Sequence, residues 1–354
     1  MIELKKIRAL NSVANQMVSK GRGLLAADES VNTVGKRFAS INLENTEGNR
    51  RAFRNMLLAA PGEGRYISGV ILFDETIRQN ALDGRSFLKV IQDEGILPGI
   101  KVDQGLADYG GSSGEKFTKG LDGLDGRLKE YVSRGAKFAK WRSVIAIGPS
   151  LPSAGNISQN AKDLAQYALA CQENGLVPVV EPEVLMDGEH DQHRCRDASG
   201  MILGTMFEEL KNMGVAIEGI ILKANMVVPG KKSGQTATPE QVAKETLALL
   251  DEVLPVNLPG VVFLSGGQTE LDATANLNAI NQKGPQSWPL TFSFARALQD
   301  GATRTWAGKP ENLEAAQKVL LHRAKMNSLA SQGKYSSELE MDIAASGSAS
   351  RGQD

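Results

Sequence analysis

The sequence predicts a (β/α)8 barrel, in which a closed parallel sheet is surrounded by helices. Along the 354 residues, eight short runs are rich in β-branched or aliphatic residues, and Gly, Pro or a charged residue closes them. Helical patterns lie between many of these runs, and such repeated strand–helix alternation is typical of this fold. A barrel usually needs about 250 residues, which leaves room for extensions. A doubly wound open sheet is the alternative architecture.

The predicted strands are short, and their side chains alternate between the two faces of the sheet. Their ranges are 24–28, 66–73, 96–103, 137–142, 176–182, 219–224, 261–266 and 290–294. Among the helical segments, 159–174 carries its apolar residues on one stripe. Another begins with Thr238 as N-cap, Pro239 in the first turn and Gln241 completing a capping box. A last long helix is predicted over 310–330, and one more helix before the first strand.

Composition separates one domain from a tail and excludes several protein classes. We expect residues 1–335 to form the barrel domain and residues 336–354, which are small and polar, to be a mobile tail. The 40 Lys and Arg residues balance 41 Asp and Glu residues, so no basic field would draw nucleic acid or a membrane surface. Cys171 and Cys195 lack CxxC spacing, which suits a reducing compartment. Without an apolar run of signal-peptide or transmembrane length, we expect a cytoplasmic protein.

Charged side chains close most of the predicted strands. In a barrel, the carboxyl ends of the strands carry the active site, and residues two apart on a strand point to the same face. The residues at these ends are Asp28, Lys101, Asp103, Lys140, Arg142, Glu181, Glu183, Lys223 and the group Ser265, Gly266 and Gly267. Because so many charged ends converge in one fold, we expect a single site there.

Lys223 indicates the chemistry of that site, because it directly follows an aliphatic strand. A lone strand-end lysine would ordinarily reach solvent, since a buried ammonium is costly unless it is paired. Lysine is a nucleophile only when neutral, yet its unperturbed pKa is near ~10.4. A second cation about 4 Å away, for which Lys140 is the natural candidate, favours the neutral amine together with desolvation. The nearby carboxylates are those of Glu181, Glu183 and Asp28. This set predicts Schiff-base chemistry on a carbonyl.

Anion-binding features accompany that lysine. Two glycines after Ser265 can turn backbone N–H groups toward an anion, and Arg296 follows the eighth strand. The loops after strands seven and eight of a barrel commonly hold phosphate. The candidates for a second anion are Lys101, Arg142 and the pair Lys36 and Arg37. Two separated anion sites around a Schiff-base lysine indicate a sugar bisphosphate.

Eight segments, in order and within about residues 5–335, resemble the class I fructose-bisphosphate aldolases. They are LAADES at 25–30, ENTEGNRR at 44–51, GLDGL at 120–124, FAKWR at 138–142, GLVPVVEPEVL at 175–185, ILKANMVVPG at 221–230, FLSGGQ at 263–268 and FSFARAL at 292–298. The resemblance implies reversible aldol cleavage of fructose 1,6-bisphosphate to dihydroxyacetone phosphate and glyceraldehyde 3-phosphate, in glycolysis, gluconeogenesis or the Calvin cycle. It also implies a metal-free enzyme that is commonly a homotetramer.

The resemblance also implies residue roles. Lys223 would form the Schiff base and Glu181 would be the main proton-transfer residue. Assisting roles would fall to Glu183, Lys140 and Asp28. One phosphate would be bound by Arg37, Ser30, Lys101 and Arg142. The other would be bound by Ser265, Gly266, Gly267, Ser293 and Arg296.

The chain departs from the family pattern at three places. Ala224 stands where the family usually has Pro, and Ala295 stands where it usually has Gly. Eukaryotic members end in a tyrosine that helps to move a proton at the enamine carbon, whereas this chain ends in Asp354 and its last tyrosine is Tyr335. We therefore expect the tail to contribute little to that step.

Other functions are open to the sequence alone. A transaldolase or a deoxyribose-phosphate aldolase would need only one strong anion site, and a silent phosphosugar-binding protein would show an eroded lysine–glutamate cluster. A metal-dependent aldolase is not predicted, since His190 and His193 lie in a polar loop without the HExxH order. The preference among fructose 1,6-bisphosphate, fructose 1-phosphate and sedoheptulose 1,7-bisphosphate is likewise open.

Overall fold

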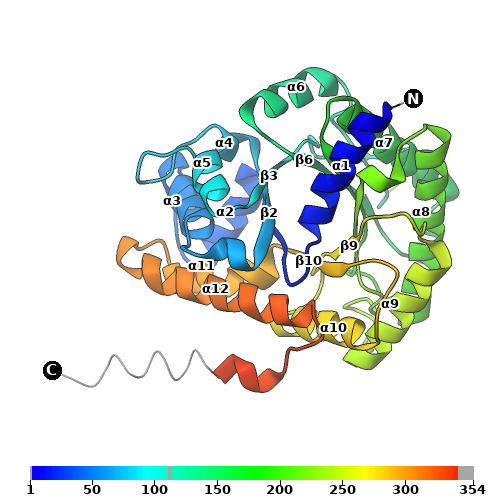
Figure 1. The fold of residues 1–354 in the computed structure, drawn as a ribbon. Helices are drawn as coiled ribbons and strands as arrows, with labels where there is room; N and C mark the ends of the chain where they lie inside the picture. Colours follow the sequence, from blue (N-terminus) through cyan, green and yellow to red (C-terminus); the bar gives the residue numbers. More distant parts are fainter. Residues whose placement is uncertain (1, 111–113, 342–354) are drawn as a thin grey trace.

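Eight parallel strands close into a barrel, as the sequence predicts (Figure 1). This fold is seen in a computed structural model that describes residues 2–110 and 114–341. Around the barrel the strands follow the chain order, and each predicted run overlaps one of them. The strands are β1 (Gly23–Ala27), β2 (Ile67–Leu72), β3 (Leu97–Lys101), β6 (Phe138–Ile145), β7 (Val177–Val184), β8 (Ile221–Ala224), β9 (Val261–Phe263) and β10 (Leu290–Phe294).

Helices follow the strands and cover the outside of the barrel. They are α1 (Leu4–Met17), α2 (Val31–Ala39), α3 (Glu47–Leu58), α4 (Asp74–Ile77), α5 (Phe87–Asp93), α6 (Leu124–Arg134), α7 (Ala154–Glu173), α8 (Gln192–Asn212), α9 (Pro239–Val253), α10 (Glu270–Gln282), α11 (Arg296–Trp306) and α12 (Leu313–Ala330). The predicted capping box of α9 is present, with Thr238 and Gln241 bonded reciprocally. The predicted first and last helices are α1 and α12.

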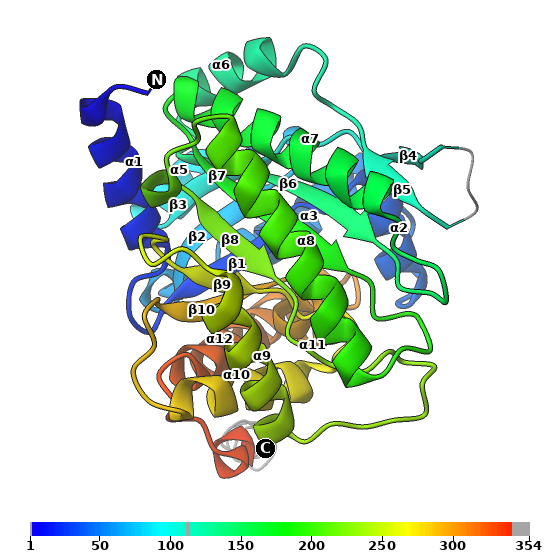
Figure 2. The same ribbon diagram turned by 90° about the vertical axis from the view of Figure 1, so that its right-hand side faces the viewer.

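Alternating residues of the strands fill the barrel interior and leave its carboxyl end polar. The inner apolar layer consists of Leu24, Ala26, Ile71, Phe138, Val177, Val179, Ile221 and Val262. The ring of Phe138 fits because Gly99 has no side chain, and a Cβ there would lie 2.2 Å from the ring. Helix α1 packs Leu10, Ala14 and Met17 against this layer and closes the amino-terminal mouth (Figures 1 and 2). The same alternation carries the next inner positions toward the opposite mouth, where the charged residues lie.

A second apolar layer joins the outer faces of the strands to the helices. Leu25, Leu72 and Phe263 belong to it, and so do Trp141 of β6 and Tyr167 of α7, whose rings stack with centroids 5.5 Å apart. Because this layer immobilises each strand against its helix, the side chains at the strand ends are held on rigid elements.

Two features differ from, or lie beyond, the predicted pattern. A small antiparallel hairpin of β4 (Leu106–Asp108) and β5 (Lys116–Thr118) follows β3, and its three-residue strands are too short for periodicity to reveal. In the predicted tail, a short helical turn η4 (Ser337–Met341) brings Glu340 to His322 and Arg323 of α12. Residues 342–354 lie outside the described residues, so the mobility of the tail stays a prediction.

Candidate active site

Four charged side chains form a continuous chain of contacts at the carboxyl ends of β1, β6, β7 and β8. The ammonium of Lys140 lies 2.9 Å from Asp28 Oδ2 and 3.0 Å from Glu181 Oε2. The other oxygen of Glu181, Oε1, lies 3.0 Å from the ammonium of Lys223. All four side chains are buried. Two carboxylates therefore alternate with two ammonium groups, and the cluster as a whole is close to neutral.

Strand alternation explains why these four residues meet. Asp28 directly follows β1, two residues after the inner residue Ala26. Lys140, Glu181 and Lys223 likewise stand two residues beyond inner apolar residues of β6, β7 and β8. The register pairs Lys140 laterally with Val179, and Glu181 with Arg142. Because the strands of a barrel are tilted and staggered, inner side chains that are offset in register still converge at its carboxyl end.

The ion pairs determine the charge of the cluster. Burial alone would raise the pKa of the Asp28 carboxyl, but Lys140 and Lys223 reverse the effect and hold it well below its usual range. Glu181 behaves in the same way. Burial would raise the pKa of its carboxyl, but the neighbouring Lys140 and Lys223 lower it. Burial would lower the pKa of Lys140, whereas Asp28 and Glu181 raise it well above the ordinary lysine value. Both carboxylates are thus ionised at neutral pH and can accept a proton.

The structure adds one element that the sequence argument lacked. The sequence suggested Lys140 as a second cation near Lys223. The carboxylate of Glu181 contacts both lysines, with one oxygen 3.0 Å from each ammonium. The Lys223 amine therefore has an ionised proton acceptor in contact, and Lys140 acts on it through that acceptor.

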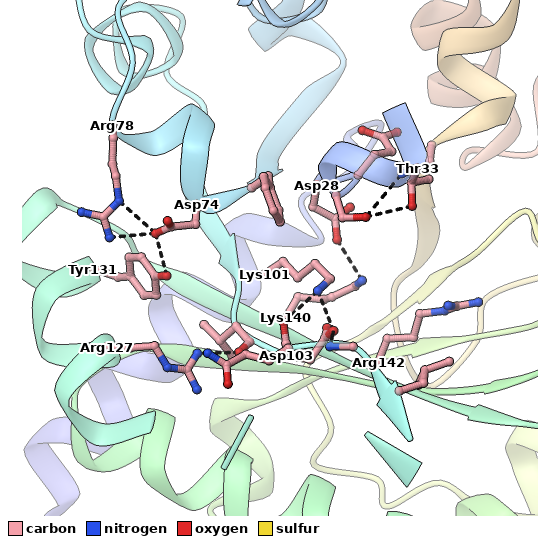
Figure 3. Close-up of a pocket in the computed structure, with 18 residues that line it drawn as sticks. Asp28, Thr33, Asp74, Arg78, Lys101, Asp103, Arg127, Tyr131, Lys140 and Arg142 are labelled. Atoms are coloured by element: carbon pink, nitrogen blue, oxygen red, sulfur yellow. Dashed lines mark hydrogen bonds and ion pairs between the residues drawn. The ribbon is translucent and has the colours of Figure 1, made fainter. Parts of the chain in front are cut away.

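A cavity of about 710 Å³ opens beside this cluster (Figure 3). Five of the predicted site residues line it: Asp28, Ser30, Lys101, Lys140 and Arg142. Lys101 lies 2.6 Å from Asp103 Oδ1. Arg142 contacts Glu183. Burial would lower the pKa of Arg142, but this carboxylate raises it. The cavity thus combines two buried catalytic candidates with cations that are already oriented by carboxylates.

Arg37 does not line this cavity, although it is predicted to bind the same phosphate as Ser30, Lys101 and Arg142. Its guanidinium lies 2.7 Å from Glu29 Oε1 and also donates to Gln299 Oε1. Glu29 also pairs with the buried Arg54. Burial would raise the pKa of Glu29, but the guanidinium groups of Arg37 and Arg54 lower it. Arg37 is therefore engaged by a buried carboxylate, and its predicted contact with a substrate phosphate stays a prediction.

The second predicted anion site lies after β9 and β10. In the glycine turn, residues 265–268, the N–H of Gln268 donates to the carbonyl of Ser265 at 3.0 Å. Gly267 has φ +81°, which a side chain would disfavour, and a Cβ on Gly266 would lie 2.9 Å from Glu183 Oε1. This backbone has no room for larger residues, and it lies beside the carboxylate of Glu183.

Ser293 and Arg296 complete that side of the site. Ser293 is buried in β10, and within residues 2–110 and 114–341 its hydroxyl has no hydrogen-bond partner. Arg296 is exposed and occupies the first position of α11, where the positive end of a helix favours an anion. Ala295 precedes it with φ −103°, so an alanine is accommodated without a left-handed backbone.

Sequence reasoning missed one wall of the cavity. Asp74, Arg78 and Tyr131 line it, with Asp74 Oδ1 2.8 Å from Arg78 and 2.9 Å from the Tyr131 hydroxyl (Figure 3). Asp74 comes directly after the second strand in ILFDE, so the strand-end rule could have found it. Tyr131 lies in α6, far along the chain, and no sequence signal places it here.

The described residues contain neither a metal-binding cluster nor a helix that could span a membrane. Among residues 2–110 and 114–341, no group of three or more His, Cys, Asp and Glu side chains is arranged to hold a metal ion. None of the helices in the same residues combines the length and the apolar character that a bilayer crossing requires.

Comparison with known proteins decides the family. The profile described as Glycolytic, fructose-bisphosphate aldolase class-I, matches residues 9–351. The chain belongs to this family. Fructose-bisphosphate aldolase 4, cytosolic, of Arabidopsis thaliana is 50% identical over 343 residues, 96% of this chain and 87% of the relative. Fructose-bisphosphate aldolase 2, chloroplastic, of the same plant is 51% identical over 348 residues.

A solved structure agrees with the class I aldolase fold. It is a fructose-bisphosphate aldolase from Plasmodium falciparum in complex with TRAP and a small-molecule inhibitor. It matches with a TM-score of 0.93 and 46% sequence identity, over 95% of this chain and 97% of that chain. As a class I fructose-bisphosphate aldolase, the chain is an aldehyde-lyase, and its reaction is the reversible aldol cleavage of fructose 1,6-bisphosphate.

Proposed function

We propose that Lys223 carries the Schiff base of this reaction and that Glu181 moves the protons. The observation that supports this assignment is the contact of one buried, ionised carboxylate with both lysines, at 3.0 Å each. No other carboxylate of the described residues lies within ion-pair distance of Lys223. The base is therefore already in place beside the nucleophile, as efficient proton transfer requires.

The first step is the formation of an imine. Glu181 takes a proton from the ammonium of Lys223, and the neutral amine adds to the ketone carbon. The protonated Glu181 gives that proton to the new oxyanion, whose charge the Lys140 ammonium stabilises, and then takes a second proton from the amine nitrogen. Glu181 returns this second proton to the hydroxyl group, which leaves as water while a protonated imine remains on Lys223. Both protons of the departing water thus come from the Lys223 nitrogen through Glu181.

The second step breaks a carbon–carbon bond. Glu181 removes the proton from the hydroxyl on the carbon beyond that bond, and an aldehyde carbonyl forms there. The electron pair of the broken bond moves into the protonated imine and yields an enamine. Lys140 assists by holding Asp28 and Glu181 ionised, and Glu183 assists by orienting Arg142. The imine is the electron sink, so the protein's own residues complete this step without a cofactor.

Two anion sites would hold the phosphates of the substrate. One consists of Ser30, Lys101 and Arg142 around the cavity, with Arg37 behind Glu29. The other consists of Ser265, Gly266, Gly267, Ser293 and Arg296. Charge-assisted contacts at both ends of a sugar bisphosphate would orient the ketone toward Lys223.

Three further properties stay predictions for this chain. A metal-free mechanism and a homotetramer are supported by the class I family. A cytoplasmic location is supported by the cytosolic Arabidopsis relative, while chloroplastic relatives are as similar.

Reductive trapping tests the assignment of Lys223. Borohydride added together with fructose 1,6-bisphosphate should inactivate the enzyme and add the mass of the reduced adduct at Lys223. Borohydride without substrate is the control, and a Lys223→Met variant should take up no adduct and cleave no substrate. EDTA should leave the activity of the native chain unchanged. An adduct at another lysine, or loss of activity on chelation, would refute the mechanism.

A further inference from the structure

We propose that Lys231, in the loop after β8, is a further binding residue for the substrate phosphate at the glycine turn. The inference rests on the proposed function, because it concerns the same reaction and the same phosphate. It adds a second cation to a site where Arg296 is the only predicted one. Its effect would be on substrate affinity.

The loops after β7 and β8 fix the backbone of Lys231. The N–H of Lys231 donates to the carbonyl of Met186 at 2.8 Å, and the N–H of Lys232 donates to the carbonyl of Gly188 at 3.0 Å. These two bonds hold the two loops together. The Lys231 side chain therefore leaves from a defined position beside the active-site end of the barrel.

The stem of Lys231 lies against the glycine turn. A Cβ on Gly267 would stand 2.7 Å from Met186 Cβ and 3.5 Å from Lys231 Cε. The ammonium is one bond beyond Cε, so it lies near the backbone that is proposed to bind phosphate. Three loops, after β7, β8 and β9, thus meet at this turn, and Lys231 contributes the charge.

The charge of Lys231 is available to a ligand. The side chain is exposed, and within residues 2–110 and 114–341 no carboxylate lies within ion-pair distance of its ammonium. By contrast, Lys101, Lys140 and Arg142 all have carboxylate partners. An unpaired cation at the edge of a site attracts an incoming phosphate dianion, and salt weakens that attraction over about 10 Å.

Lys232 provides a matched control in the same loop. It has the same charge, is also exposed and is likewise fixed by a backbone bond to the β7 loop. None of the three atoms nearest to a Cβ on Gly267 belongs to it. A general effect of surface charge would therefore be the same at both lysines, whereas a phosphate contact would be confined to Lys231.

Steady-state kinetics with fructose 1,6-bisphosphate can separate these outcomes. Lys231→Met should raise KM about threefold to fivefold with kcat within twofold of the native value, and Lys231→Arg should restore KM. Lys232→Met should leave KM within about 1.5-fold. The increase of KM with added salt should be shallower in Lys231→Met than in the native chain, because one screened attraction is missing.

An unchanged KM in Lys231→Met, or equal shifts in Lys231→Met and Lys232→Met, would overturn the inference. Either result would leave the aldolase reaction itself intact, since the native chain is assayed alongside. If the native chain failed to cleave the substrate, the proposed function would be at fault instead.

Discussion

Two buried glutamates at opposite ends of the barrel have pKa values that are shifted in opposite directions. Glu181, at the active-site end, is 2% exposed and has an ammonium on each oxygen. Glu63 lies in η1 (Glu63–Arg65), just before β2, and is 1% exposed. Within residues 2–110 and 114–341, neither of its oxygens has a hydrogen-bond partner. Burial, with Glu94 adding to it, raises the pKa of Glu63 well above its usual range, while the lysines lower that of Glu181.

The comparison shows that partners, and not depth, decide the charge of a buried carboxyl. Glu181 remains ionised and can act as a base because each of its oxygens is compensated. The pKa of Glu63 is raised because ionisation would leave an uncompensated charge in the core. The active site is therefore distinguished by the pairing of its charged groups.

The largest effect is expected from Glu181→Gln. The amide cannot accept the Lys223 proton, so kcat should fall by about 10²–10⁴. Glu63→Gln is the matched control, because it makes the same change at an equally buried position, and it should keep the native kcat. Turnover of Glu181→Gln within twofold of the control would remove Glu181 from the mechanism.

A moderate effect is expected from Arg296→Ala. Loss of a charge-assisted contact with phosphate should raise KM for fructose 1,6-bisphosphate about tenfold with little change in kcat. Arg304→Ala is the control on the same helix, since Arg304 pairs with Glu270 at 3.3 Å. Equal KM values for the two variants would place the phosphate away from Arg296.

A smaller effect, on stability, is expected from Glu63→Gln. The pKa of Glu63 is higher in the folded chain than in the unfolded chain, where it is near ~4.3. The contribution of Glu63 to stability is therefore complete below the unfolded-state pKa and is lost as pH rises through the folded-state pKa. The variant does not titrate, so its free energy of unfolding relative to the native chain should increase with pH, by about 1–2 kcal/mol at alkaline pH. Urea unfolding at several pH values measures the difference. A difference that is constant with pH would show that Glu63 is ionised throughout.

The smallest effect on catalysis is expected from ending the chain after Ser336. Cleavage should stay within about threefold, below ~1 kcal/mol in barrier. Stability should fall by about 1–3 kcal/mol, because the buried Arg323 loses the carboxylate of Glu340. Glu340→Gln in the full-length chain should reproduce this loss of stability. A hundredfold drop in activity with an intact circular dichroism spectrum would show that the tail takes part in catalysis.

The sequence predicts the barrel and the positions of the charges more fully than their pairing. Each strand has its own apolar run, and the two-residue period carries Asp28, Lys140, Glu181 and Lys223 to one end. That Glu181 stands between the lysines depends on side-chain directions across three strands, which no local pattern encodes.

Two buried ion-pair and carboxyl positions are not predicted from the sequence. Arg37 meets Glu29, which is held from the other side by Arg54. Glu63, in the segment PGEGR, is buried, and within residues 2–110 and 114–341 neither carboxyl oxygen has a hydrogen-bond partner. Burial of single charged residues in loops is set by tertiary packing, so periodicity gives no sign of it.

Carbon-13 NMR of chains labelled at the glutamate carboxyl carbons measures the protonation states of Glu181 and Glu63. The signals of the two residues are assigned by their absence in Glu181→Gln and Glu63→Gln. At pH 7 we expect an ionised carboxylate at Glu181 and a protonated carboxyl at Glu63. A protonated Glu181, or an ionised Glu63, would show that partners do not decide the charge of these buried carboxyls.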